Sequence, residues 1–269
     1  MAPLVLRGCL RPEHDPRPVI VVSVLPQAWF VERLAGDAGR IVVMVPPGAS
    51  PATHEPTINQ VRAVARAALY VKVGHPAFPF ERAWLDRLMA ETEGIRRVSC
   101  LGDTSVHPGD PHLWTSPRHM RRVVPDLAAA LAEVLPEHDA AIERSARRLE
   151  DALVALDRDL ARTLSDLPRR RFYVFHPSWG YLARDYGLEQ VPIELGAKEP
   201  DAYSLRGVLE RARRDGARTV FAQPQFSRRA ADLVADAIDG RVVALDPLAR
   251  DWDDNLRRVA RALRAELAR

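Results

Sequence analysis

Lysine is almost absent from this chain of 269 residues, since Lys72 and Lys198 are the only two. The other fixed positive charges are arginines, the net charge is only +3, and no run of five or more basic residues occurs. Aromatic residues make up 6% of the chain and do not alternate with the arginines. Nucleic-acid binding normally needs a basic patch or stripe. We therefore expect no nucleic-acid partner.

Cysteine and long apolar runs are also scarce. Cys9 and Cys100 are the only cysteines and no CxxC pair occurs, which excludes a disulfide framework. No stretch approaches 18 consecutive apolar residues, so the sequence predicts no transmembrane helix. HExxH, GxSxG, GxGxxG and the GxxxxGK(S/T) phosphate loop are missing as well. The sequence therefore gives no support to an HExxH zinc hydrolase, a serine hydrolase, or an enzyme that uses a dinucleotide or an NTP.

The first 17 residues are rich in proline and carry no clear export signal. The segment 6–9, Leu-Arg-Gly-Cys, weakly resembles a lipoprotein cleavage site. The apolar part, residues 3–6, is too short for a signal peptide, and Arg7 interrupts it. We therefore expect either a disordered leader or a truncated or mis-started export signal. Whether Cys9 carries a lipid stays open.

Short apolar runs alternate with helical patterns along the rest of the chain, and apolar residues make up 47% of it. Continuous β-branched runs between helices are typical of parallel sheets that are buried on both faces. The expected strands are 19–24, 41–45, 69–73, 96–100, 172–175, 188–193, 219–222 and 242–245. The expected helices are 26–34, 59–68, 80–92, 117–135, 137–167, 179–186, 204–215, 228–238 and 252–267.

The helix expected at 137–167 carries one apolar stripe with spacings of three and four. At 1.5 Å per residue it would be roughly 45 Å long, longer than one small domain is wide. Only one such helix is visible, which favours a helix that spans two domains over a coiled coil. The predicted fold class is α/β: two lobes, each with a parallel-type sheet flanked by helices, joined by one long helix. We divide the chain into a leader (1–17), an N-terminal lobe (18–135), the connecting helix (136–168) and a C-terminal lobe (169–269).

Four polar residues stand just after predicted strands, two in each lobe. His54 and His112 follow strands of the first lobe, and His176 and Asp246 directly follow strands of the second. Because ligands bind at the carboxyl ends of parallel strands, all four would face the crevice between the lobes. Three imidazoles and one carboxylate suit a tetrahedral Zn²⁺ site, whereas Mn²⁺ prefers more oxygen ligands. The sequence therefore predicts a zinc site, with manganese as the alternative.

Each of these residues also has a plainer interpretation. A single loop histidine is more often structural than a ligand, and an Asp-Pro pair is an ordinary end of a strand. His75 also ends a strand and could face the same crevice. We expect His119 and His138, which lie in helical segments, to face solvent. A metal-dependent enzyme stays possible, but four protein ligands leave no position for a reactive water, which favours binding without catalysis.

Six segments in order identify a family resemblance. They are VVSVLPQAWFVERLAGD, VVMVPPGASPATHEPT, DPHLWTSP, FHPSWGYLARDYGL, KEPDAYSL and FAQPQFS. Over residues 18–269 they resemble the metal-binding solute-binding proteins of zinc and manganese ABC transporters (cluster A-I). The resemblance implies two α/β lobes bridged by a long helix, with the metal held between them. It implies a monomeric periplasmic or membrane-anchored extracytoplasmic protein that delivers Zn²⁺, or alternatively Mn²⁺, to an ABC permease.

The resemblance also implies ligands. His112 in DPHLW, His176 in FHPSWGY and Asp246 in LDPL match three of the family's metal ligands. The fourth position is occupied by Ala52, where the family pattern Pro-His-x-aromatic-Glu-Pro has histidine, and His54 occupies the aromatic position. Either His54 supplies the missing imidazole, which we favour, or it stacks in place of the aromatic residue. In the second case the shell has three protein ligands plus water or His75.

Two acidic residues and one loop complete the expectations. Glu55 would cap or orient its loop, whereas Asp110 would hold His112 as a hydrogen-bond partner or be an ordinary turn residue. The loop 101–111 carries only Asp103, His107 and Asp110, so the His/Asp-rich insert of many zinc members is absent or vestigial. Because Ala52 departs from the pattern, a second possibility is a member that lost its metal site and serves as a partner protein.

Overall fold

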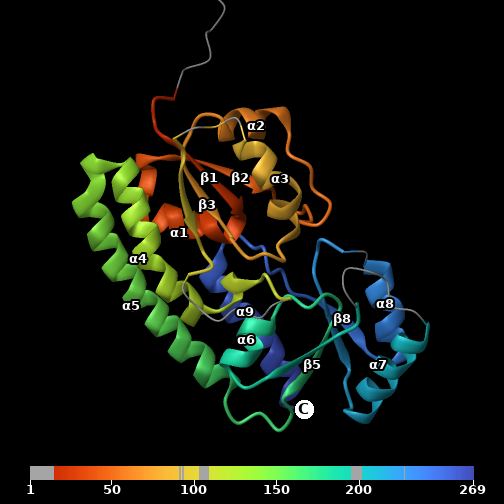
Figure 1. Ribbon diagram of the computed structural model, residues 1–269. Helices are drawn as coiled ribbons and strands as arrows, with labels where there is room; N and C mark the ends of the chain where they lie inside the picture. Colours follow the sequence, from red (N-terminus) through yellow and green to blue (C-terminus); the bar gives the residue numbers. More distant parts are fainter. Residues whose placement is uncertain (1–14, 91, 93, 103–108, 195–201, 227) are drawn as a thin grey trace, which may run out of the picture.

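Two lobes and a long flank of helices make up the protein (Figure 1). The computed structural model describes residues 15–90, 92, 94–102, 109–194, 202–226 and 228–269. Most of the predicted leader with Cys9, and Asp103 and His107 of the loop 101–111, lie outside the described residues. None of the helices in the described ranges combines the length and the apolar character needed to cross a membrane.

The N-terminal lobe is built on a parallel sheet in the order β2-β1-β3-β4. Its central strand β1 is buried along its whole length, and Val21 pairs with Val42 on one side and Tyr70 on the other. Valine-rich strands buried on both faces are typical of parallel sheets. The strands are β1 (Val19–Val24), β2 (Arg40–Val45), β3 (Ala67–Lys72) and β4 (Arg96–Ser99), and the helices are α1 (Leu25–Ala35), η1 (Gly36–Ala38), α2 (Ile58–Val64), α3 (Pro79–Met89), η2 (Leu113–Thr115) and α4 (Pro117–Val134).

The C-terminal lobe repeats this arrangement with a parallel sheet in the order β6-β5-β7-β8. Its strands are β5 (Arg171–Val174), β6 (Glu189–Pro192), β7 (Thr219–Ala222) and β8 (Arg241–Ala244), and its helices are α6 (Gly180–Asp185), α7 (Ala202–Arg214), α8 (Arg228–Ala237) and α9 (Trp252–Leu267). The predicted fold class is therefore confirmed. In each sheet the strand order reverses beside the first strand, and such a reversal opens a crevice at the carboxyl ends of the strands.

The largest difference from the predicted elements lies between α2 and β3. The alanine-rich segment after Val64 was expected to continue the helix to residue 68, but α2 ends at Val64 and β3 begins at Ala67. Ala67 pairs with Val19 in the sheet. Alanine has high helix propensity, but propensity is a weak preference that tertiary pairing overrides.

The helix α5 (Asp139–Leu164) connects the lobes, preceded by the short turn η3 (Pro136–His138). With 26 residues it is about 39 Å long. Figure 1 shows α4 and α5 in green along one flank, beside both lobes. The predicted stripe is buried throughout against α4, α1 and α9: Ile142, Ala146, Leu149, Leu153, Leu156, Leu160 and Leu164. The predicted spanning helix is confirmed, whereas the residue limits given to the lobes stay a prediction.

A tryptophan cluster between α1 and α9 also joins the lobes. The ring of Trp252 in α9 packs against Trp29 and Phe30 of α1, at centroid distances of 5.0 and 4.8 Å. Its Nε1 donates to the carbonyl of Trp114 at 2.7 Å, and Trp114 Nε1 donates to the carbonyl of Pro247 at 2.7 Å. Buried aromatic contacts with satisfied indole groups hold their partners in one geometry. Together with α5 they limit how far the cleft between the lobes can open.

The expectation for His119 was wrong, whereas His138 is exposed as predicted. His119 lies in the first turn of α4 and its side chain is buried. Its Nε2 lies 2.7 Å from the carbonyl oxygen of Cys100. Burial lowers the pKa of His119, so the ring stays neutral near pH 7 and can donate from Nε2. A buried backbone carbonyl needs a donor, and the sequence alone does not reveal which histidine supplies it.

The stripe of α5 is tested by replacing Leu153 with alanine. Because Leu153 is 1% exposed and faces the shared core, L153A should lower the free energy of unfolding by about 2–5 kcal/mol. Urea denaturation followed by circular dichroism measures the change. The matched control R158A, on the exposed side of the same helix, should stay within about 0.5 kcal/mol. Equal effects of the two substitutions would contradict the assignment of the buried face.

Candidate functional site

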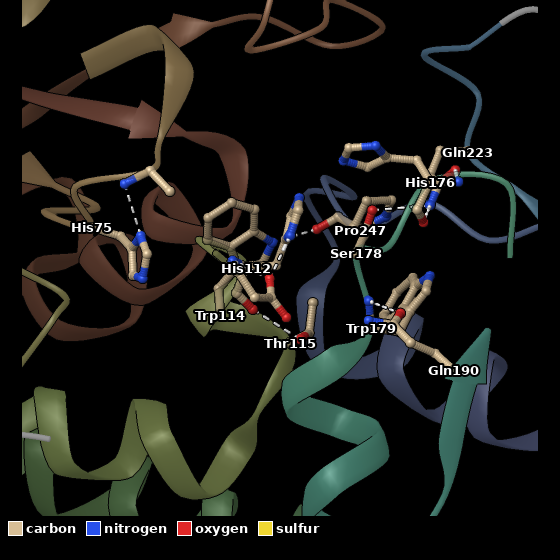
Figure 2. Close-up of polar contacts among 12 residues, drawn as sticks. His75, His112, Trp114, Thr115, His176, Ser178, Trp179, Gln190, Gln223 and Pro247 are labelled. Carbon is tan, nitrogen blue, oxygen red and sulfur yellow. Dashed lines mark hydrogen bonds and ion pairs between the residues drawn. The ribbon is translucent and has the colours of Figure 1, made fainter. Parts of the chain in front are cut away.

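Two of the four predicted ligands face each other across the cleft between the lobes. His112 lies at the start of η2 in the N-terminal lobe, and His176 follows β5 in the C-terminal lobe. Their ring centroids are 5.4 Å apart and the rings are nearly perpendicular, at 79°. Figure 2 shows His112 near the centre and His176 to its right, with His75 to the left, in the N-terminal lobe. Residues 64 positions apart in sequence therefore form a pair at one point.

A carboxylate holds each of these two imidazoles at Nδ1. Asp110 Oδ1 lies 2.7 Å from Nδ1 of His112 and also accepts from the backbone N–H of His112 at 3.0 Å. Glu194 Oε2 lies 3.1 Å from Nδ1 of His176. A carboxylate at Nδ1 keeps the proton there, so that Nε2 carries the lone pair that binds a metal. Asp110 was expected to be either a hydrogen-bond partner of His112 or an ordinary turn residue, and in the structure it is hydrogen-bonded to His112.

The position of Asp110 depends on a glycine in the other lobe. Gly180 begins α6, and a Cβ atom placed on it would lie 2.3 Å from Asp110 Oδ2 and 2.9 Å from Gln190 Nε2. A side chain at this position would displace Asp110, and with it the partner of His112. The start of α6 is therefore part of the support of the site, although it contributes no ligand.

The sequence interpretation missed Glu194 and Gln223. Gln223 follows β7 and forms two hydrogen bonds with the backbone of His176. Its Nε2 donates to the His176 carbonyl at 2.6 Å, and its Oε1 accepts from the His176 N–H at 3.3 Å. Phe226 stacks on the His176 ring at a centroid distance of 4.7 Å. Both Glu194 and Gln223 stand just after strands, and this is the signal that could have identified them. The search for polar residues just after strands considered only histidines and one aspartate, and left out glutamate and glutamine.

Asp246, the third predicted ligand, follows β8. Its Oδ1 accepts from Gln225 Nε2 at 2.8 Å and from the backbone N–H of Leu248 at 2.9 Å. In the described part of the chain no donor binds Oδ2, which leaves this oxygen for a cation. The bond from Trp114 to the carbonyl of Pro247 ties this loop to the turn that carries His112.

His54 lies away from the cleft. Its ring stacks on Phe80 at a centroid distance of 6.1 Å, and its Nε2 is buried without a hydrogen-bond partner. Ala52, two residues earlier, lines the cleft instead. This is the arrangement of the second interpretation of His54, in which it takes the place of an aromatic residue.

His75 and Glu55 are also not part of the pair that His112 and His176 form. His75 is 2% exposed, and its Nδ1 accepts from the backbone N–H of Ala77 at 3.0 Å. Glu55 is exposed, and no described residue forms a hydrogen bond or ion pair with its carboxylate. The end of its loop is held instead by the capping box of Thr57 and Gln60 at the start of α2.

The cleft between the lobes has a volume of about 540 Å³. Its lining includes Ala52, Arg82, His112, His176, Glu194 and Phe226. Over the residues that the structure describes, no three histidine, cysteine, aspartate or glutamate side chains are gathered closely enough to hold a metal ion. The structure therefore pairs His112 with His176, and does not bring Asp246 or His54 to the same point.

The carboxylate contacts predict the tautomers of the two imidazoles. In the metal-free protein at pH 8, His112 and His176 should carry the proton on Nδ1, because Asp110 and Glu194 accept from that atom. Long-range ¹⁵N–¹H NMR correlations distinguish the protonated ring nitrogen from the bare one. Exposed His138, which has no such partner in the described structure, is the internal control and should show a mixture. A proton on Nε2 of His112 or His176 would contradict the assignment.

Comparison with known proteins identifies similar sequences. The family model described as "Zinc-uptake complex component A periplasmic" (ZnuA) matches residues 20–266. The high-affinity zinc uptake system protein ZnuA of Bacillus subtilis (strain 168) is 24% identical over 248 residues, which cover 85% of this chain and 78% of that protein. The likeness extends through both lobes and the connecting helix.

Solved structures agree with the sequence comparison. A crystal structure of ZnuA superposes with a TM-score of 0.88 at 36% identity, and covers 93% of this chain and 99% of its own. A zinc-bound ZnuA deletion mutant superposes with a TM-score of 0.88 at 35% identity, and covers 94% and 99% of the two chains. The resemblance seen in the six sequence segments is confirmed: the chain belongs to the ZnuA family of solute-binding proteins.

Proposed function

We propose that this protein captures one Zn²⁺ ion outside the cytoplasmic membrane and delivers it, as a monomer, to an ABC permease. The observation that supports the proposal is the pair of His112 and His176, whose Nδ1 atoms are each held by a carboxylate from their own lobe. Two imidazoles that present Nε2 across a cleft form one half of a tetrahedral zinc shell. A relative with 24% identity is named as a zinc uptake protein, and a solved structure with 35% identity is named as zinc-bound.

Asp246 would complete the protein's contribution to the shell. Its Oδ2 has no donor among the described residues, and its loop is tied to the His112 turn through Trp114. A small closure of the cleft would bring this oxygen to the ion. Zinc is preferred to manganese because two of the three protein donors are imidazole nitrogens, and manganese favours sites richer in oxygen.

Release follows from the same geometry. The ion is held by residues of both lobes, so a small change in their relative position weakens the site by removing donors from one side. Because α5 and the tryptophan cluster resist a wide opening, we propose that contact with the permease supplies this displacement.

The first test is the zinc stoichiometry and its dependence on His176. The purified protein should bind about one Zn²⁺ per chain, as measured by elemental analysis after dialysis. H176A should lower zinc affinity at least about hundredfold, because it removes a nitrogen ligand and leaves Glu194 without its partner. The control H138A changes an exposed histidine and should leave the affinity unchanged. An unchanged affinity in H176A would overturn the assignment.

The second test concerns His54. We propose that His54 packs against Phe80 in place of an aromatic residue and that the protein supplies three ligands. H54F should therefore bind zinc within about threefold of the natural chain, because phenylalanine keeps the stacking contact but has no nitrogen. Competition against a fluorescent zinc chelator measures the affinity. A loss of hundredfold or more would show that His54 is a ligand, as the other interpretation of the sequence holds.

A further inference from the structure

The proposed shell has one coordination position that no side chain of the described chain fills. Zinc in proteins is four-coordinate as a rule, and the proposed protein donors are His112, His176 and Asp246. His54 is turned onto Phe80, and the residue that lines the cleft beside it is Ala52, whose methyl group is no donor. Among the residues that the structure describes, no further donor remains for this position.

The cleft is large for a metal ion with one water. Its volume is about 540 Å³, whereas one water occupies about 30 Å³ of the liquid. Sites for small organic molecules span about 300–1,000 Å³. The walls combine apolar surface from Phe78 and Phe226 with polar groups, as in sites of that kind.

One arginine that lines the cleft has no ion-pair partner among the described residues. Arg82 is the fourth residue of α3 and is exposed, and no carboxylate of the described chain pairs with its guanidinium. Glu194, the other charged side chain that lines the cleft besides the histidines, is engaged by His176. A guanidinium binds a carboxylate through two parallel hydrogen bonds.

We propose that the cleft takes up zinc as a complex with a small amino-acid chelator. A nitrogen donor of the chelator fills the coordination position that Ala52 cannot fill, and its carboxylate pairs with Arg82. This inference rests on the proposed function and adds the chemical class of the ligand that accompanies the ion. It follows from three features of one cleft: a missing protein donor, room for a small molecule, and an unpaired guanidinium.

L-Histidine and histamine form a matched pair of probes, because both can fill the one open position through an imidazole nitrogen and only histidine has a carboxylate. Equilibrium dialysis with radiolabelled probe should show about one L-histidine retained per chain in the presence of zinc and none after zinc is removed with EDTA. Histamine should be retained at least about tenfold more weakly, since it cannot pair with Arg82.

Three variants complete the test. R82Q should lower zinc-dependent retention of histidine about tenfold and leave zinc binding from chelator-free buffer unchanged. R87Q, an exposed arginine of the same helix that does not line the cleft, should have no effect. A52H should bind zinc and release the chelator, because it supplies the missing imidazole.

The outcomes separate this inference from the proposed function. Zinc binding without retained histidine, or equal retention of histidine and histamine by the natural chain and R82Q, would overturn the inference and leave the proposed function intact. Absence of zinc binding under all conditions would overturn both.

Discussion

The site depends on one mechanical constraint, which is the set of buried contacts that join the two lobes. The helix α5 buries its apolar stripe against helices of both lobes, and Trp252 of α9 packs directly on α1. Buried surface of this kind is rigid because protein interiors are densely packed. The ring centroids of His112 and His176 can therefore lie 5.4 Å apart although the two residues belong to different lobes. A more loosely joined pair of lobes would not hold two imidazoles in one orientation.

The site also depends on the carboxylates that contact its two histidines. Each imidazole has a carboxylate at Nδ1, and each carboxylate is itself placed by the fold: Asp110 by the space at Gly180, and Glu194 by its position after β6. A carboxylate that accepts from Nδ1 raises the basicity of the opposite nitrogen. The proposed zinc affinity thus comes from the partners of the histidines as much as from the histidines. In our proposal Arg82, which lines the same cleft, selects the ligand that accompanies the ion.

Most of the fold could be predicted from the spacing of apolar residues along the sequence. Valine runs such as that of β1 and the stripe of α5 depend on burial alone, and burial leaves a direct pattern in the sequence. The boundary between α2 and β3 was misjudged because alanine favours a helix, and only the pairing of Ala67 with Val19 in the sheet overrides that preference. His119 was misjudged because its partner is the backbone carbonyl of Cys100, which no side-chain pattern reveals. Glu194 stands just after a strand and could have been considered, but its pairing with His176 exists only once β5 and β6 lie side by side.

The central claim is that His112 and His176, from opposite lobes, bind the same ion. The most direct measurement is a crystal structure of the protein grown with zinc, with anomalous diffraction recorded on both sides of the zinc absorption edge. The account predicts one strong anomalous peak about 2.0–2.1 Å from Nε2 of both histidines, with an oxygen of Asp246 in the same shell. A zinc peak elsewhere, or a cleft with these two rings turned apart and without zinc, would contradict it.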